Sequence, residues 1–133
     1  MSRWRTASPL TLAATLTAAG VVHLTAPGTF DGLIPSWLPG PPRAWIYGSG
    51  ASELLCAAGL LVPRSRQTGA ASTALLFVSV FPGNIEMAVH PGGLPRWIAL
   101  ARLPLQVPLV LWALQVGRDA ASDAHPATGA AAR

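Results

Sequence analysis

Residues 68–89 read TGAASTALLFVSVFPGNIEMAV, an apolar run with Glu86 as its one charged residue. In an α-helix, which rises 1.5 Å per residue, this run would be about 33 Å long, close to the bilayer hydrocarbon thickness of about 30 Å. Three comparable runs occupy residues 9–24, 43–62 and 97–116. The sequence therefore predicts an all-α fold, an integral membrane four-helix bundle formed by residues 1–117.

Composition supports a membrane protein and excludes several other classes. The 133 residues suffice for one domain; 51% are hydrophobic, 11% are charged and the mean hydropathy is +0.44. A soluble domain usually carries about a quarter charged residues. The nine basic residues are scattered rather than aligned, which argues against nucleic-acid binding. Cys56 is the single cysteine, so one chain can form neither a disulfide nor a CxxC pair.

The placement of arginines predicts the orientation in the bacterial inner membrane. Cytoplasmic ends of membrane helices carry an excess of arginine and lysine. By this rule the cytoplasmic side holds five arginines and the outer side holds two: Arg3, Arg5, Arg64, Arg66 and Arg118, against Arg43 and Arg96. We expect both termini in the cytoplasm and a disordered cytoplasmic tail over residues 118–133. The alternative for the first run is a cleaved signal peptide, because two arginines precede it.

The first connection, residues 25–42, is proline-rich but also apolar. It contains five prolines together with Phe30, Leu33, Ile34, Trp37 and Leu38. Irregular backbone is not tolerated in contact with the lipid core, so this segment must lie in the headgroup region or fold over the mouth of the bundle. Two interpretations stay open, an interfacial anchor and a lid over a binding cavity.

Polar side chains within the predicted spans mark a candidate site, because a charge near the bilayer centre costs at least about 2.5 kcal/mol. The candidates for ligand binding or proton exchange are His23, Glu53, Asn84, Arg102 and Gln106. We expect an ionised Glu53 to pair with Arg102 or to accept hydrogen bonds from Asn84 and Gln106. The alternative is an interhelical polar clasp that only fixes packing.

Prolines within the third and fourth runs predict local changes in the helices. Pro82 with Gly83 should kink or loosen the third helix just before Asn84, and Pro104 with Pro108 should do the same in the fourth. Glu86 is expected to point outward, away from the pocket. A lone His23 without a second histidine four residues away gives no reason to predict a metal site.

Six short segments give the chain a resemblance to a known family. They are GVVH (20–23), IPSWLP (34–39), YGSGASE (47–53), GLLVPRSR (59–66), FPGNIEM (81–87) and RLPLQ (102–106). Over residues 20–112 the chain resembles the DoxX family of small four-helix bacterial membrane proteins, in particular its DoxX-like branch. The resemblance implies an all-helical inner-membrane fold and a shared site formed by the five candidate residues above.

The resemblance also implies a class of function. The family takes its name from a subunit of a terminal quinol oxidase, and other members are associated with redox partners. We therefore expect an accessory, non-catalytic subunit that binds a quinone or another lipidic molecule beside a redox protein; if redox-active, it would be a quinone-linked oxidoreductase component. The alternatives are a structural or assembly subunit without a ligand, and a small permease. Homo-oligomerisation is compatible with all three. The lone Cys56 departs from cysteine-bearing relatives and argues against thiol-based electron transfer.

Overall fold

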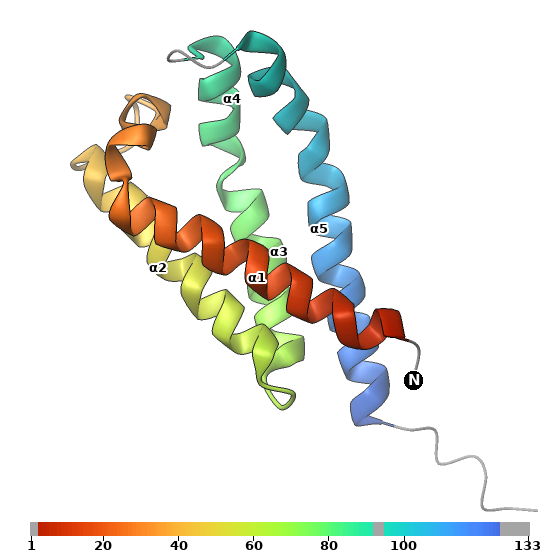
Figure 1. Cartoon of the computed structure of the whole chain (residues 1–133). Coiled ribbons are helices and arrows are strands. Elements are labelled where there is room, and N and C mark those ends of the chain that lie inside the picture. Colours follow the sequence, from red (N-terminus) through yellow and green to blue (C-terminus); the bar gives the residue numbers. More distant parts are fainter. Residues whose placement is uncertain (1–2, 92–94, 126–133) are drawn as a thin grey trace, which may run out of the picture.

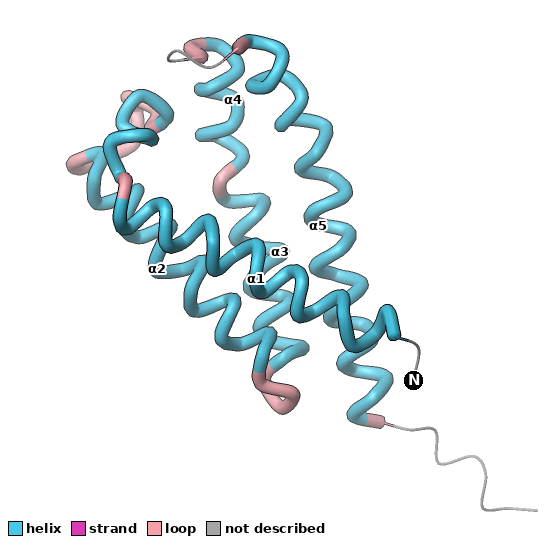
Figure 2. The backbone as a smooth tube through the Cα atoms, viewed as in Figure 1, coloured by secondary structure: helices cyan, strands magenta, loops and turns pink. Residues whose placement is uncertain are grey.

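The computed structural model describes residues 3–91 and 95–125, and within these residues the fold is all-helical. Five α-helices and one 3₁₀ helix follow one another along the chain (Figures 1 and 2). They are α1 (Arg3–Thr25), η1 (Pro27–Leu33), α2 (Pro42–Leu61), α3 (Arg66–Ser79), α4 (Phe81–Val89) and α5 (Arg96–Ala124). The predicted all-α class is confirmed.

Three segments in the described part of the chain are long and apolar enough to cross a membrane. They are α1, the combined α3–α4 segment Arg66–Val89, and α5. The 20-residue helix α2 is not in this set; its length would suffice, but it carries the buried Glu53. The fold is therefore that of a membrane protein with at least three candidate spans.

The third predicted helix is divided in two, which replaces the simple four-helix pattern. The α3 helix ends at Ser79, and α4 begins at Phe81 with Pro82 in its first turn. Proline has no amide hydrogen and its ring collides with the carbonyl four residues back, which here is that of Val78. The loosening predicted at Pro82 and Gly83 is thus present as a break between the two helices, drawn as a loop in Figure 2.

The last helix is longer than the sequence suggests. The α5 helix continues through Pro104 and Pro108 and ends only at Ala124. The prediction that the whole of residues 118–133 is disordered is therefore wrong for the first seven of them; residues 126–133 lie outside the described residues. The physical reason is a tertiary contact, because Arg5 pairs with Asp119 at 3.4 Å and with Asp123 at 3.0 Å.

Close helix contacts in the structure depend on glycine. A Cβ added to Gly20 would lie 2.9 Å from the Gly50 carbonyl oxygen, so α1 and α2 touch through their backbones. A Cβ added to Gly69 would lie 2.6 Å from the carbonyl carbon of Gly59, so α2 and α3 do the same beside their connection. Small residues at such crossings let the two backbones approach closely, so that the helices pack tightly against each other. This packing stabilises the helix pair in the membrane, where burial of apolar surface gives no advantage over contact with lipid.

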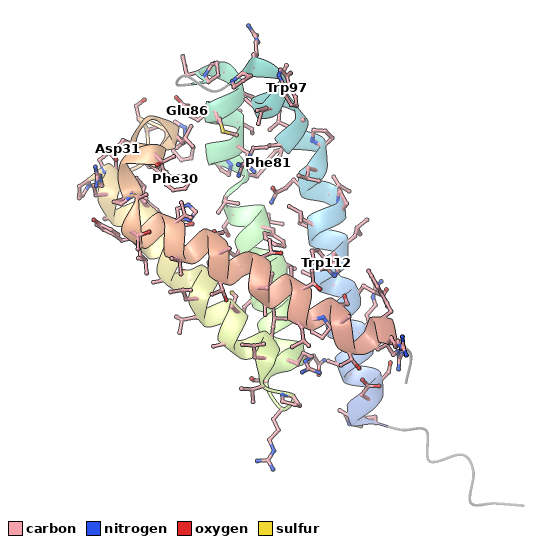
Figure 3. The ribbon with its side chains drawn as sticks, viewed as in Figure 1. Phe30, Asp31, Phe81, Glu86, Trp97 and Trp112 are labelled. Atoms are coloured by element: carbon pink, nitrogen blue, oxygen red, sulfur yellow. The ribbon has the colours of Figure 1, made fainter. Side chains whose placement is uncertain are left out.

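The packed core occupies one half of the bundle. Its buried residues come from the first half of α1, the end of α2, the start of α3 and the last part of α5: Leu12, Ala13, Leu16, Cys56, Ala57, Leu60, Ala70, Ala74, Ala113 and Val116. Trp112 closes this half by donating from Nε1 to Ser8 Oγ at 2.7 Å (Figure 3). Toward the other end the α1–α2 pair diverges from α4 and α5 (Figure 1).

The outer surface is apolar, as expected for a protein in lipid. Large hydrophobic side chains stand exposed on every α-helix, including Leu55, Leu75, Val107 and Leu111. A soluble monomer rarely exposes a continuous apolar surface of this kind. The side chains in Figure 3 project outward around the bundle in the same way.

Candidate functional site

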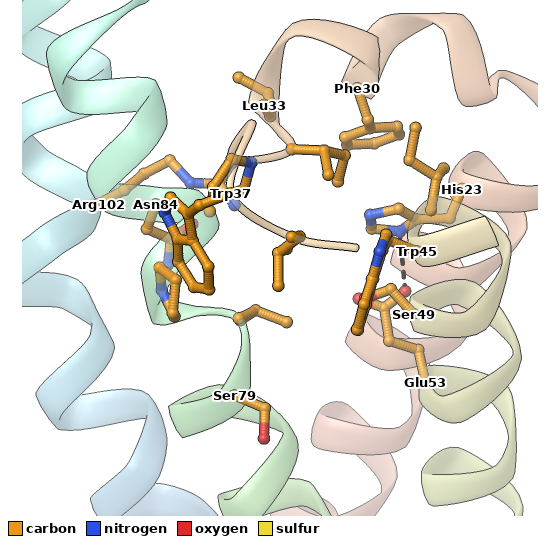
Figure 4. Close-up of a pocket in the computed structure, with 17 residues that line it drawn as sticks. His23, Phe30, Leu33, Trp37, Trp45, Ser49, Glu53, Ser79, Asn84 and Arg102 are labelled. Carbon is orange, nitrogen blue, oxygen red and sulfur yellow. Dashed lines mark ion pairs between the residues drawn. The ribbon is translucent and has the colours of Figure 1, made fainter. Parts of the chain in front are cut away.

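A cavity of about 230 Å³ lies in the diverging half of the bundle, beneath the first connection. One wall consists of α1 and α2 residues and the opposite wall of α4 and α5 residues, as Figure 4 shows for His23 and Glu53 against Asn84 and Arg102. Four of the five candidate residues named from the sequence thus line a single cavity. Gln106, the fifth, is not part of the lining.

The wall formed by α1 and α2 carries a close pair of titratable side chains. His23 Nδ1 lies 2.9 Å from Glu53 Oε2, and it also lies 2.9 Å from the carbonyl oxygen of Ala19. This one ring nitrogen therefore lies at hydrogen-bond distance from two oxygens, the Glu53 carboxyl and the Ala19 carbonyl one turn earlier. Glu53 Oε2 is fully enclosed and receives no directed hydrogen bond from any described residue.

An enclosed carboxyl oxygen without a donor is energetically costly. Glu53 as a residue is only 8% exposed. Leaving a buried acceptor unsatisfied costs about 1–3 kcal/mol, and more for a charged one. Native structures pair nearly all such groups with protein atoms or bound molecules, so a carboxyl group in this state in the lining of a cavity favours a hydrogen-bond donor there.

The sequence interpretation that joined Glu53 to Arg102, or to Asn84 and Gln106, is not what the structure forms. Arg102 enters the cavity from α5, across from Glu53 (Figure 4). Glu53 instead lies against His23, because the Gly20–Gly50 contact holds α1 closer to α2 than α5 is. The cavity therefore has an acidic oxygen on one side and a guanidinium on the other.

Asn84 and Gln106 form a separate polar contact behind the α4–α5 wall. Asn84 Nδ2 donates to Gln106 Oε1 at 2.9 Å, and Gln106 Nε2 donates to the carbonyl oxygen of Phe77. That carbonyl belongs to the end of α3, just before the break at Pro82. The clasp fixes the orientation of Asn84 at the edge of the cavity.

The first connection covers the cavity, which favours the lid over the simple anchor. Phe30 of η1 stacks on the His23 ring, with centroids 4.0 Å apart and planes inclined by 15° (Figure 4). Further lining side chains come from the same connection: Leu33, Ile34, Pro35, Trp37 and Leu38. These side chains make the roof apolar.

Two contacts tie this roof to α2. Arg43 donates from Nε to Asp31 Oδ1 at 2.7 Å and from Nη2 to Asp31 Oδ2 at 2.8 Å, a bidentate ion pair. Trp45 Nε1 donates to the Pro39 carbonyl oxygen at 2.8 Å. Between them Gly40, at φ 85°, adopts the left-handed conformation that lets the chain turn into α2.

The lining contains residues that were not among the sequence candidates. Trp45 and Ser49 of α2 and Ser79 of α3 complete the cavity wall. Ser49 is one helical turn before Glu53, so the four-residue spacing does predict a shared face. Trp45 and Ser79 carry no comparable signal, because an aromatic or a serine in a membrane helix is common at any position.

The remaining polar residues lie apart from the cavity. Glu86 pairs with His90 at 3.0 Å near the end of α4, where the His90 side chain is exposed (Figure 3). Cys56 is buried in the packed core. No group of three or more potential metal ligands comes together within residues 3–91 and 95–125.

The family described as a domain of unknown function, DUF8561, matches residues 12–117. The chain belongs to the DUF8561 family. No curated protein and no solved structure matches the chain.

The DUF8561 match contains every residue that lines the cavity, from His23 to Arg102. The ion pairs of Arg5 with Asp119 and Asp123 lie outside it. The cavity therefore lies within the DUF8561 region of this chain, whereas the ion pairs at the end of α5 involve residues on either side of that region.

Proposed function

We propose that this DUF8561 protein is a DoxX-like four-span protein of the bacterial inner membrane that binds the headgroup of a quinone or a similar lipidic molecule. In this proposal α2 is the fourth span, and the protein is an accessory subunit that holds the ligand for a redox protein partner. It supplies no redox group of its own. The ligand occupies the cavity between Glu53 and Arg102.

The observation that carries the proposal is Glu53, a carboxyl group in the lining of the cavity whose enclosed Oε2 has the His23 ring nitrogen beside it but no hydrogen bond of its own. A hydroxyl group in the cavity that donates to the Glu53 carboxyl would supply a hydrogen bond to this largely buried group. The reduced form of a quinone, a quinol, carries two such hydroxyl groups on a flat ring. A carboxylate beside a histidine also suits proton exchange with that hydroxyl.

The opposite wall supplies the complementary chemistry. The Arg102 guanidinium is a donor without acceptor capacity, so it suits a carbonyl or second hydroxyl oxygen on the far side of the ring. The Asn84 side chain, oriented by Gln106, stands beside it. Phe30, Trp37 and Trp45 provide aromatic faces for a planar ring.

The size of the cavity favours a headgroup over a whole lipidic molecule. Pockets that enclose drug-sized ligands measure about 300–1000 Å³. The present cavity, at about 230 Å³, is smaller. A ring with its substituents suits this volume, and a long chain would have to leave it.

Arginine placement supports an orientation with both termini in the cytoplasm. The Arg5–Asp119 pair joins the start of α1 to the last part of α5, so these two helix ends lie at one end of the bundle (Figure 1). The α2–α3 connection, which contains Arg64, lies toward the same end. The roof with Arg43 lies at the opposite end. The excess of arginine therefore marks the end away from the cavity as cytoplasmic.

Mass spectrometry of the purified protein tests the proposal. Wild type in mild detergent should retain a quinone or related lipid, and Glu53→Gln should retain much less of it. Glu86→Gln is the matched control, since it makes the same chemical change outside the cavity. A ligand content equal in all three proteins, or no small molecule in wild type, would contradict the proposal.

A second candidate, an assembly subunit without a ligand, has one observation in its favour. In the Asn84–Gln106 clasp both polar atoms of the Gln106 side chain are paired within the bundle, which requires no ligand. In that case a protein partner would co-purify equally with wild type and with Glu53→Gln, and neither would contain a small molecule.

A further inference from the structure

A second hollow adjoins the cavity on the side where α2 faces α3. It measures about 530 Å³ and opens on the surface of the bundle between these two helices. Trp45, Ser49, Ser79 and Val80 line both spaces, so the two adjoin along these side chains. We call this second hollow the α2–α3 groove.

The α2–α3 groove is mainly apolar, because two of the serine hydroxyls in its lining are already hydrogen-bonded within their helices. Ser52 Oγ donates to the Gly48 carbonyl oxygen at 2.8 Å, and Ser79 Oγ donates to that of Leu75, also at 2.8 Å. Both hydroxyl groups are thereby satisfied within their own helices. Ser49 is the third serine in the lining, and the other lining residues are mostly apolar, including Ala44, Leu76 and Val80.

We propose that the α2–α3 groove holds the hydrocarbon chain of the same ligand whose headgroup occupies the cavity, and that the ligand enters sideways from the bilayer. This inference rests on the proposed function. The cavity is too small for a chain, the first connection covers it, and the groove is the adjoining, mainly apolar space beside it. A single-chain amphiphile fits this arrangement, with a ring between Glu53 and Arg102 and a chain passing Trp45.

Gly48 offers a way to block the groove without disturbing the fold. A Cβ added at Gly48 would meet nothing within 4 Å, so a side chain there projects into open space at the groove. Gly48→Phe should therefore fill the path of the chain. Leu55→Phe is the matched control, because Leu55 lies two turns further along the same face of α2 and is 74% exposed.

Photo-crosslinking in lipid nanodiscs tests the inference with two benzoquinol probes. One carries a decyl chain that ends in a diazirine, and the other is the same ring without a chain. The expected crosslinks fall on α2 and α3 around Gly48, Ser52 and Leu76, and an excess of the chainless ring prevents them. Gly48→Phe should reduce crosslinking at least about tenfold, whereas Leu55→Phe leaves it unchanged and both variants still bind the chainless ring.

Three results would overturn the inference, and they are distinguishable. Crosslinks on residues 30–38 would show entry through the roof. Groove crosslinks that the chainless ring does not prevent would show that bulk lipid fills the groove. Failure of wild type to bind the chainless ring would refute the proposed function itself, and the inference with it.

Discussion

His23 and Glu53 are brought to 2.9 Å of each other, Nδ1 to Oε2, by the backbone contact between Gly20 and Gly50. Each glycine lies three residues before one member of the pair, so the crossing of α1 and α2 sets the distance between the two side chains. The chemistry of the cavity therefore depends on two positions without side chains. This dependence can be tested without any ligand.

Gly50→Ala should destabilise the protein and disturb the pair. The added methyl would lie 2.8 Å from His23 Cβ, so α1 must move away from α2. Overpacking of this kind costs about 1–3 kcal/mol. Thermal unfolding in detergent should show a lower Tm than wild type.

Gly48→Ala is the control for that change, on the same helix one half-turn earlier. Its methyl meets nothing within 4 Å, and alanine is favoured over glycine in a helix by about 0.5–1 kcal/mol. The Tm should stay the same or rise slightly. Equal losses of Tm in the two variants would show that the α1–α2 contact is less tight than described.

Asp31→Asn should loosen the roof of the cavity. The bidentate Arg43–Asp31 ion pair joins η1 to the first turn of α2. The neutral amide of asparagine would remove the negative charge that attracts Arg43. The pair is exposed, so the loss of stability should be small. Access is the more sensitive measurement: a Ser49→Cys side chain in the cavity should react faster with maleimide when Asp31→Asn is present.

Two controls make the labelling interpretable. Cys56 is buried in the core, so wild type should react slowly. Asp123→Asn removes an acidic charge at the other end of the molecule and should leave the rate at Ser49→Cys unchanged. An Asp31→Asn rate no higher than that of the control would mean that η1 is held by its apolar contacts alone.

Arg5→Ala should shorten α5. Arg5 contacts Asp119 and Asp123, and none of the residues 119–124 is fully buried. Hydrogen exchange of the amides of residues 119–124 should become faster, while exchange in residues 97–113 stays unchanged. Arg3→Ala is the control, because Arg3 does not form these ion pairs. Equally fast exchange in Arg3→Ala and Arg5→Ala would contradict the role assigned to Arg5.

The orientation in the membrane predicts where cysteine probes react. In intact bacterial cells an impermeant maleimide should label Arg96→Cys but leave Arg64→Cys unlabelled, because the α2–α3 connection is expected in the cytoplasm. Both should react after the membrane is permeabilised. The reverse pattern would invert the proposed topology.

Helices and their breaks follow closely from the sequence, whereas side-chain partners do not. Hydrophobic length located the apolar runs, and Pro82 with Gly83 located the break between α3 and α4. The predicted partners of Glu53 are wrong. The depth of a residue in the membrane can be counted along its helix, and depth places Glu53 near Arg102. The rotation of α1 and α2 and the distance between them cannot be counted in this way, because they depend on the contact between Gly20 and Gly50. Sequence spacing does not reveal that meeting.

The first connection and the end of α5 show the same limit. Phe30 and Trp37 suit a segment in the headgroup region of the membrane as well as a roof over a cavity. The stacking of Phe30 on His23 in the structure is what favours the roof. Residues 118–124 have the composition of a disordered tail, yet two ion pairs with Arg5, more than a hundred residues away, accompany their helical structure.

Affinity of the chainless benzoquinol for the protein in nanodiscs tests the central claim most directly. A hydrogen bond to a charged acceptor is worth about 1 kcal/mol more than one to a neutral acceptor, so Glu53→Gln should weaken binding about five- to tenfold. Glu86→Gln should bind like wild type. Binding that is equal in wild type and Glu53→Gln, or absent from wild type, would contradict the assignment of Glu53 as the residue that receives the ligand.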